Sequence, residues 1–316
     1  MIPESADQKE EKTILVTGAH RTGTTWVGKM LAASREVAYV SEPLNRWHRP
    51  GVMRAPVRHW YTYICKDNEA EFLQALKETR RFQYHTLEEV GSIASVKDLL
   101  RMGRDWSIFF RGRLYHQTLL IKDPFAVFSA AWFAERLNAS VLFTVRHPAA
   151  FVSSLKKLRW PFDFSDLLEQ PLLMRDWLEP FQEEMEEALK TPQDVIAGGS
   201  LLWRMIYRVV GQLCDRCPSF QIVRHEDLSL DPVGRLQELY SDLGLPFSSQ
   251  VIRTIQEYSA EENPGELSRR AVHSVKLDSR ANLENWKHRL SQEEIERIRR
   301  LTSDVSHRYY RETEWD

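Results

Sequence analysis

The sequence Gly18-Ala-His-Arg-Thr-Gly23-Thr-Thr25 has two glycines in the GxxxxG spacing of a phosphate-binding loop. A short β-branched run, Thr13 to Thr17, precedes this stretch, and a helix-prone run, Thr25 to Ser34, follows it. A loop between a strand and a helix presents backbone N–H groups and the positive end of the helix dipole to an anion. The sequence therefore predicts an α/β fold that begins with a phosphate-binding loop.

Near-continuous apolar runs recur further along the chain and alternate with helix-prone stretches. The expected strands are residues 37–40, 119–121, 141–145 and 220–223, and the expected helices are residues 125–137, 149–158 and 233–243. Runs of this kind are typical of strands that are buried on both faces. We therefore predict a P-loop-like three-layer sandwich, with a central parallel sheet between two layers of helices.

Two longer segments, residues 44–117 and 159–199, fit this pattern poorly because they are helix-prone only in parts and are broken by prolines. We expect one domain over residues 1–316, in which these segments form helical caps over the carboxyl edge of the sheet. Residues 291–307 carry a Ser N-cap, a Glu three positions later and an apolar stripe. This pattern predicts a surface helix.

The composition narrows the class of protein. A formal net charge of −2 gives no global attraction to nucleic acid, and no apolar run approaches the roughly 20 residues that a membrane span needs. The first twelve residues lack the apolar core of a secretory signal, so we expect a cytoplasmic protein. Only three cysteines are present, and the pair Cys214 and Cys217 has no second pair beside it, so we predict packed thiols and no metal site.

The residues of the loop indicate which phosphate compound binds. Thr24 follows Gly23 where nucleotide kinases carry the lysine that reaches the β- and γ-phosphates, and this argues against a nucleoside triphosphate. Arg21 supplies a cation from inside the loop, and Thr22, Thr24 and Thr25 supply hydroxyl groups. The competing interpretation is an ordinary glycine turn before a helix.

Two motifs resemble the sulfotransferases that use 3′-phosphoadenylyl sulfate (PAPS). Arg21-Thr-Gly-Thr-Thr-Trp26 is similar to the loop that binds the 5′-phosphosulfate in that family. Val141-Leu-Phe-Thr-Val-Arg146 is similar to a strand that ends in an arginine, and Ser154 follows eight positions later. In the family, such an arginine and serine bind the 3′-phosphate. The resemblance implies that PAPS is the donor of a sulfuryl group for a hydroxyl or an amine.

Three weaker matches concern the rest of the nucleotide. Trp26 stands where the family often stacks the adenine, although a tryptophan here is also compatible with a core position. His225, in Val-Arg-His-Glu-Asp-Leu, resembles the aromatic residue of a Tyr-Glu-Asp-Leu motif that touches adenine, and the alternative is a surface histidine. Arg280 is the one residue in register with the family's basic Arg-Lys-Gly loop, which implies a contact with the 3′-phosphate.

Sulfuryl transfer needs a base for the acceptor proton and cations for the departing phosphate oxygen. Lys122 closes an expected strand but is followed by Asp-Pro, so the histidine base of the cytosolic members is absent. Glu42, in Glu-Pro-Leu, resembles a motif of the carbohydrate sulfotransferases and is our candidate base, with Lys122 and Arg21 as the catalytic cations. Asp123 is the rival base, and an N-cap is its structural alternative. For Glu42, the alternative to a base is a carboxylate that orients the loop or caps it. For Lys122, the alternative to a catalytic cation is a strand-end lysine exposed to solvent.

Residues 45–60 contain four arginines, two histidines, two tryptophans and no acid. This mixture suits a small-molecule or glycan acceptor that is anionic or a sugar, with arginines for carboxylate or sulfate and aromatic rings for sugar faces. Residues 159–164 are expected to form the opposite wall, and a cap loop that packs its tryptophans is the alternative. Two other functions remain open at this point. They are a small-molecule kinase that uses ATP and magnesium, and a nucleotide-binding module without activity.

Overall fold

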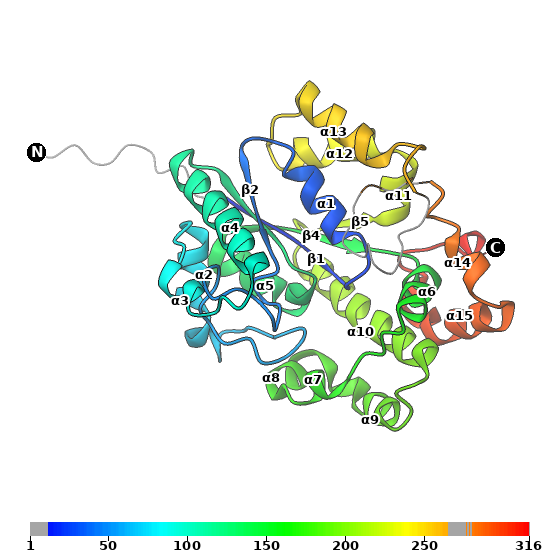
Figure 1. Cartoon of the computed structure of the whole chain (residues 1–316). Coiled ribbons are helices and arrows are strands. Elements are labelled where there is room, and N and C mark those ends of the chain that lie inside the picture. Colours follow the sequence, from blue (N-terminus) through cyan, green and yellow to red (C-terminus); the bar gives the residue numbers. More distant parts are fainter. Residues whose placement is uncertain (1–11, 265–275, 277, 279, 316) are drawn as a thin grey trace, which may run out of the picture.

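The computed structural model describes residues 12–264, 276, 278 and 280–315. Five parallel strands form one sheet in the order β2-β3-β1-β4-β5 (Figure 1). They are β1 (Thr13–Gly18), β2 (Val37–Ser41), β3 (Thr118–Lys122), β4 (Ala139–Val145) and β5 (Gln221–Arg224). All five predicted strands are present, and the α/β class with a parallel sheet is confirmed.

Both faces of the sheet are buried. In β1, Ile14 and Val16 pack on one side with α1 (Thr24–Leu31), α12 (Pro232–Asp242) and α13 (Ser249–Ser259). Leu15 packs on the other side with α5 (Ala130–Leu137), α6 (Pro148–Leu158) and α10 (Val195–Arg216). Figure 1 shows these two helical layers above and below the strands. Helix α1 ends at Leu31, three residues before the predicted end, and residues 124–129 form a 3₁₀ helix (Pro124–Ser129) ahead of α5.

The last helices of the chain lie against the α6 and α10 side of the sheet. Helix α11 (His225–Leu230) follows β5 and packs on α12, on the opposite side of the sheet, whereas α14 (Asn285–Arg289) packs on α6. Helix α15 (Gln292–Ser306) packs on both α6 and α10, and its predicted N-cap is confirmed, because Ser291 and Glu294 form a reciprocal capping box. A short 3₁₀ turn (Glu312–Glu314) follows α15.

The two segments that interrupt the pattern are mostly helical and touch each other. The first contains a 3₁₀ turn (Glu69–Glu71), α2 (Leu73–Arg80), α3 (Thr86–Val90) and α4 (Val96–Leu114). The second contains α7 (Ser165–Leu168), α8 (Pro171–Leu173), a π-helical turn (Met174–Leu178), a 3₁₀ turn (Glu179–Phe181) and α9 (Gln182–Lys190). The backbone N–H of Trp60 donates to Asp166 Oδ1 at 3.1 Å, and that of Tyr63 donates to Gln170 Oε1 at 2.8 Å. Among the described helices, none is long and apolar enough to cross a bilayer.

Candidate active site

The phosphate loop between β1 and α1 is held in a shape that only its glycines permit. Gly18 has φ +141°, and a Cβ there would lie 2.4 Å from the carbonyl oxygen of Thr144 in β4. Gly23 has φ +94°, and a Cβ there would lie 3.1 Å from His225 Nδ1. No side chain caps the N-terminus of α1 at Gly23. The loop therefore runs close against β4 and α11 and ends at a helix N-terminus, as the sequence predicts.

The threonines of the loop differ in what they can offer a ligand. The Thr22 hydroxyl is buried, donates to the Ala19 carbonyl at 2.6 Å and lies 2.8 Å from Thr144 Oγ1. This hydroxyl therefore fastens the loop to β4, and a ligand would meet Thr22 through its backbone. Thr24 is buried and Thr25 is half-buried at the start of α1. The sequence did not indicate that the Thr22 hydroxyl holds the loop in place, because this role depends on a contact with the distant strand β4.

The second phosphate motif lies directly beside the loop. Arg146 at the end of β4 donates through Nη1 to the carbonyl oxygen of Arg21 at 3.3 Å. Arg21 in turn donates through Nε to Ser154 Oγ on α6 at 3.2 Å. The Arg21 side chain thus turns toward the serine of the second motif. Two motifs more than 120 residues apart in sequence form one continuous basic site.

The electrostatics of this site favour an anion. Arg146 is 8% exposed, and its Nε has no hydrogen-bond partner within the described part of the chain. Burial lowers the pKa of Arg146 to about 10; nearby Glu226 opposes this shift, whereas Arg21 and Arg289 add to it. Burial also lowers the pKa of Arg21, and Arg289 again contributes. Because these guanidinium groups repel one another, a phosphate bound among them would relieve both repulsion and desolvation.

Arg289 is a residue that sequence reasoning missed. It closes α14, which packs on α6, and this brings its charge close to Arg21 and Arg146. The basic run Trp286-Lys-His-Arg289 is the sequence signal for it, whereas the family register pointed to Arg280. Arg280 is exposed in a turn, and its Nη2 donates to the Leu230 carbonyl at 3.4 Å. Residues 277 and 279 of its loop lie outside the described residues.

The candidate base lies at the carboxyl end of β2. Glu42 adopts φ +54°, a left-handed conformation that is uncommon for a non-glycine residue. Its Oε1 forms an ion pair with Lys122, and its Oε2 accepts a hydrogen bond from Asn45 Nδ2 at 2.7 Å. The Glu42 side chain is 29% exposed, whereas that of Lys122 is only 3% exposed. The alternative of a strand-end lysine in solvent is therefore wrong for Lys122.

Asp123 has a defined structural role. It is fully buried and caps the 3₁₀ helix through Oδ1, which accepts from the Phe125 N–H at 2.9 Å. Its Oδ2 accepts from the Leu44 N–H at 2.6 Å. Burial and, next, the charge of Glu42 raise the pKa of Asp123 to about 7. Both oxygens are therefore engaged by backbone N–H groups, and the N-cap considered from the sequence is present.

Two histidines and a tryptophan border the loop. His225 is half-buried next to Gly23, and desolvation followed by the charge of Arg146 lowers its pKa to about 3, so the neutral ring faces the loop. Trp26 is half-buried against the apolar cluster of α1, α12 and α13. His20, which sequence reasoning missed, has Nδ1 2.7 Å from the Tyr61 hydroxyl. Burial and then Arg21 lower the His20 pKa to about 4, while Glu42 opposes the shift.

The basic stretch of residues 45–60 is neutralised within the protein. Its four arginines pair with acids: Arg46 with Asp166 at 3.3 Å, Arg49 with Glu89 and with Asp98 at 3.0 Å, Arg54 with Glu78 at 2.7 Å, and Arg58 with Glu71 at 3.1 Å. By contrast, Trp47 is 78% exposed, and Trp160 in residues 159–164 is 45% exposed. The aromatic faces, more than the arginines, are therefore available to an acceptor.

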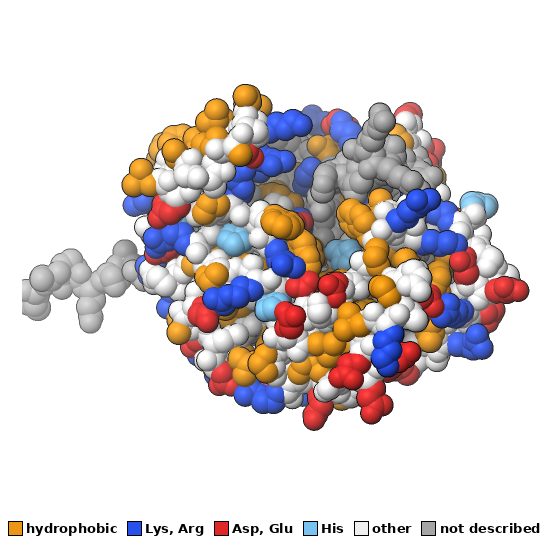
Figure 2. Space-filling view, turned by 60° about the horizontal axis from the view of Figure 1, so that its bottom comes forward, with side chains coloured by type: hydrophobic (Ala, Val, Ile, Leu, Met, Phe, Trp, Pro, Cys, Tyr) orange, Lys and Arg blue, Asp and Glu red, His pale blue; other side chains and the backbone are white. Residues whose placement is uncertain are grey.

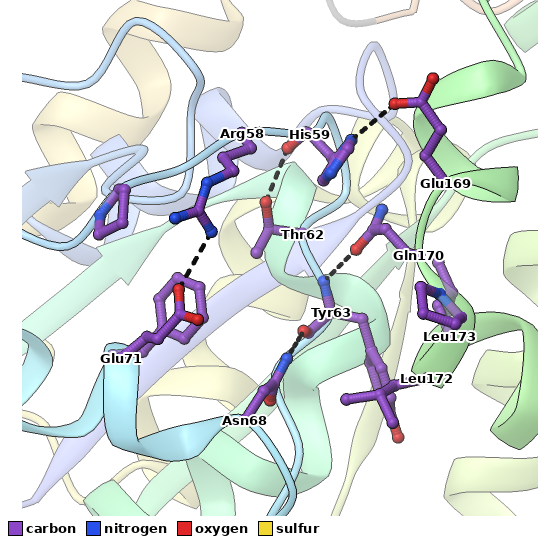
Figure 3. A pocket seen from close by; sticks show the side chains of 13 residues that line it. Arg58, His59, Thr62, Tyr63, Asn68, Glu71, Glu169, Gln170, Leu172 and Leu173 are labelled. Atoms are coloured by element: carbon purple, nitrogen blue, oxygen red, sulfur yellow. Dashed lines mark hydrogen bonds and ion pairs between the residues drawn. The ribbon is translucent and has the colours of Figure 1, made fainter.

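A cavity of about 170 Å³ lies between the two helical segments (Figure 3). Its wall includes His59, Tyr63 and Gln170, and His59 Nδ1 is 3.7 Å from Glu169 Oε2. None of the loop residues, Glu42 or Lys122 lines this cavity. It is therefore separate from the candidate catalytic groups.

The cysteines and acids do not assemble into a metal centre where the chain is described. Over residues 12–264, 276, 278 and 280–315, no group of three or more His, Cys, Asp or Glu side chains could hold an ion. Cys65, Cys214 and Cys217 are free and half-buried, as the sequence predicts for packed thiols. Burial raises the pKa of Cys214 to about 11.

A parallel sheet with a phosphate loop and a buried arginine cluster defines a protein that binds a phosphate-bearing ligand. The profile of the sulfotransferase family matches residues 13–249, and the chain belongs to that family. It is a sulfotransferase, and the family implies PAPS as its donor. This match favours sulfuryl transfer over the ATP-dependent kinase that the loop alone left open.

Solved structures of sulfotransferases are similar to the chain over most of its length. The sulfotransferase domain of the curacin biosynthetic pathway is 16% identical, with a TM-score of 0.48 and coverage of 93% of this chain and 97% of that one. A sulfotransferase from Mycobacterium avium is 13% identical, with a TM-score of 0.45 and coverage of 95% and 77%. A comparison with curated protein sequences finds no match.

Proposed function

We propose that the chain transfers the sulfuryl group of PAPS to a hydroxyl, or an amine, of a small-molecule or carbohydrate acceptor, by in-line transfer without a metal. The observation that carries this proposal is the contact between the two phosphate motifs, made by Arg21 with Ser154 and by Arg146 with Arg21. A donor with a 5′-phosphosulfate and a separate 3′-phosphate requires two adjacent anion sites. This chain has two adjacent basic motifs.

The residues present fit the donor. The backbone of Arg21, Thr22 and Gly23, with Thr24 and Thr25 at the start of α1, would hold the 5′ side. The 3′-phosphate would lie between Arg146 and Ser154, where a buried Nε is without a partner in the described structure. Trp26 and His225 would flank the adenine, and Arg280 would be the outermost cation. When bound, PAPS supplies an electrophilic sulfur and a bisphosphate leaving group.

We assign the proton transfer to Glu42. It accepts the acceptor proton while the acceptor oxygen bonds to sulfur, and Asn45 and Lys122 fix the orientation of its carboxylate. Lys122 and Arg21 offset the charge that develops on the departing phosphate oxygen. Asp123 is less suited to this role because it is fully buried and its oxygens cap backbone N–H groups, whereas the Glu42 side chain is 29% exposed.

The acceptor is most compatible with a carbohydrate or glycolipid. Pairing of the four arginines in residues 45–60 removes the unmatched charge that an anionic acceptor would need. Trp47 and Trp160 offer exposed aromatic faces, which suit the apolar faces of sugar rings. We further propose one domain with caps at residues 44–117 and 159–199, and a cytoplasmic location.

Titration calorimetry with adenosine 3′,5′-bisphosphate and with magnesium ATP tests the function. We expect metal-independent binding of the bisphosphate, and Arg146→Ala to weaken it roughly 10- to 150-fold, the value of a charge-assisted hydrogen bond. The matched control is Arg235→Ala, which removes an exposed arginine on α12. Preference for magnesium ATP, or equal affinity of Arg146→Ala and Arg235→Ala for the bisphosphate, would refute the proposal.

A further inference from the structure

Helix α4 is apolar on the face that it turns to solvent. Its exposed apolar residues are Val96, Leu99, Leu100, Trp106, Phe110 and Leu114, which we call the α4 stripe. At 3.6 residues per turn, these positions fall within an arc of about 120°. The buried residues Asp105, Phe109 and Gly112 lie on the opposite side of the helix, toward the protein. Most surface helices are polar on the outer face, so the stripe requires an explanation.

Two aromatic residues of the stripe pack on each other. The rings of Trp106 and Phe110 stack with centroids 5.1 Å apart and an interplanar angle of 8°. Gly103 lies between the two ends of the stripe, and a Cβ there would meet nothing within 4 Å. Leu87 and Val90 on the preceding helix α3 are also exposed, at 86% and 53%. Figure 2 shows hydrophobic side chains gathered at the upper left, where α4 reaches the surface, with Lys and Arg side chains beside them.

Basic residues border the stripe. Lys97, Arg104 and Arg111 lie along one side of the helix next to the apolar arc, and Arg113 lies at the other edge. Arg101 lies further round, toward the buried side, and pairs with Asp98 at 3.5 Å. The two acids of α4 are matched internally, because Asp98 pairs with Arg49 at 3.0 Å and Asp105 pairs with Arg104 at 2.8 Å. Lys97, Arg111 and Arg113 form no ion pair within the described residues. The border is therefore positive although the whole chain carries −2.

We propose that α4 docks the protein onto the surface of an anionic lipid bilayer, with its axis in the plane of the interface. Trp, Phe and Leu on one face and Lys and Arg on its border are the features of helices that lie in that plane. Lipid phosphates would match the basic border, each Lys or Arg adding to the attraction. A second copy of the chain fits less well, because a two-fold contact through the stripe would bring the two basic borders together.

Docking would also orient the molecule. Helix α4 packs on β2, the strand that leads into Glu42. The inference rests on the surface of α4 alone and is independent of the proposed sulfuryl transfer.

Vesicle flotation tests the proposal with the full chain. We expect the protein to float with vesicles of phosphatidylcholine and phosphatidylglycerol, to bind much less to phosphatidylcholine alone, and to be released by added salt. The double variant Leu100→Ser, Phe110→Ser should lose at least tenfold in partitioning. The charge variant Lys97→Gln, Arg111→Gln, Arg113→Gln should lose the preference for the anionic vesicles.

Leu189→Ser is the matched control, because it removes an apolar side chain that is 38% exposed on α9. It should float like the wild type, and circular dichroism checks that all variants fold. Absence of flotation of the wild type, or flotation that the stripe variant leaves unchanged, would overturn the proposal. A dimer in light scattering that Leu100→Ser, Phe110→Ser converts to a monomer would assign the stripe to a second copy and would overturn it as well.

Discussion

At the scale of single residues, Glu42 is the group on which the proposed chemistry depends. Its left-handed φ costs roughly 1–3 kcal/mol for a non-glycine residue, and the surrounding contacts of Asn45 and Lys122 maintain it. Strain of this kind is concentrated at functional sites because it fixes a side chain in one orientation. The orientation here pairs Oε1 with the buried Lys122 and Oε2 with Asn45.

Glu42→Gln should lower kcat about 10²- to 10⁴-fold, because the amide keeps the shape of the side chain but cannot accept the acceptor proton. Binding of adenosine 3′,5′-bisphosphate should change little, since none of the phosphate contacts involves Glu42. Initial rates of transfer from labelled PAPS, together with calorimetry on the same preparation, separate the two effects. A variant that keeps wild-type kcat would show that the base is a different residue.

Asp123→Asn is the informative comparison for Glu42. Its carboxylate accepts N–H groups from both Leu44 and Phe125, and an amide can accept only one of them. The variant should therefore lose roughly 1–3 kcal/mol of stability, seen as a lower thermal midpoint, with a smaller effect on kcat per folded molecule. If Asp123→Asn is stable and abolishes transfer, Asp123 is the base and Glu42 orients the loop.

At the scale of elements, the phosphate loop connects β1, β4 and α11 at one point. Gly23→Ala would place a methyl group at φ +94° and 3.1 Å from His225 Nδ1, so either the loop or the histidine must move. We expect at least tenfold weaker binding of the bisphosphate and a loss of roughly 1–3 kcal/mol in stability. Calorimetry and urea unfolding measure the two quantities.

Gly103→Ala is a control of the same chemical size. It lies inside α4 with open space around the added carbon, so it should raise stability by about 0.5–1 kcal/mol through helix propensity and leave bisphosphate binding unchanged. Equal binding by Gly23→Ala and the wild type would mean that the loop is not shaped for phosphate.

At the scale of the whole molecule, the sequence predicts the sheet well because each strand has a recognisable local sequence pattern. Each strand is a short apolar run flanked by residues that do not favour strands. A glycine loop or a polar residue follows at its carboxyl end. Arg21 stands inside the glycine loop, and the resemblance to the sulfotransferase motifs adds Arg146 and Ser154, so these candidates also depend on local sequence alone. Their contact with one another is a consequence of neighbouring strands in a parallel sheet.

Other features depend on contacts between distant segments, and no local pattern reveals them. Arg289 reaches the site only because α14 packs on α6. From the sequence, the arginines of residues 45–60 look available to bind a ligand. In the structure they pair with acids that are distant in sequence, such as Asp166. The Thr22 hydroxyl is taken by Ala19 and Thr144. Sequence patterns identify charged and polar groups, whereas their partners are set by tertiary structure.

One buried histidine, His147, and two half-buried ones, His20 and His225, make the stability of the whole molecule sensitive to acid. Burial is the main reason that the pKa falls to about 4 for His20 and to about 3 for His147 and His225. In the unfolded chain the same groups titrate near 6.5. Below that pH the unfolded state binds more protons, so stability present above about pH 6.5 is lost as the pH falls, at about 1.4 kcal/mol per pH unit for each histidine.

His147→Phe isolates one of these contributions. The His147 ring stacks on Trp286 at 5.0 Å, and neither ring nitrogen has a hydrogen-bond partner in the described structure, so phenylalanine can replace it. Between about pH 7 and about pH 5, the variant should lose roughly 2 kcal/mol less stability than the wild type in urea unfolding. His288→Phe, at an exposed position, should follow the wild type. Parallel pH profiles for His147→Phe and the wild type would show that His147 is protonated in the folded protein, which would require the aromatic cage around it to open.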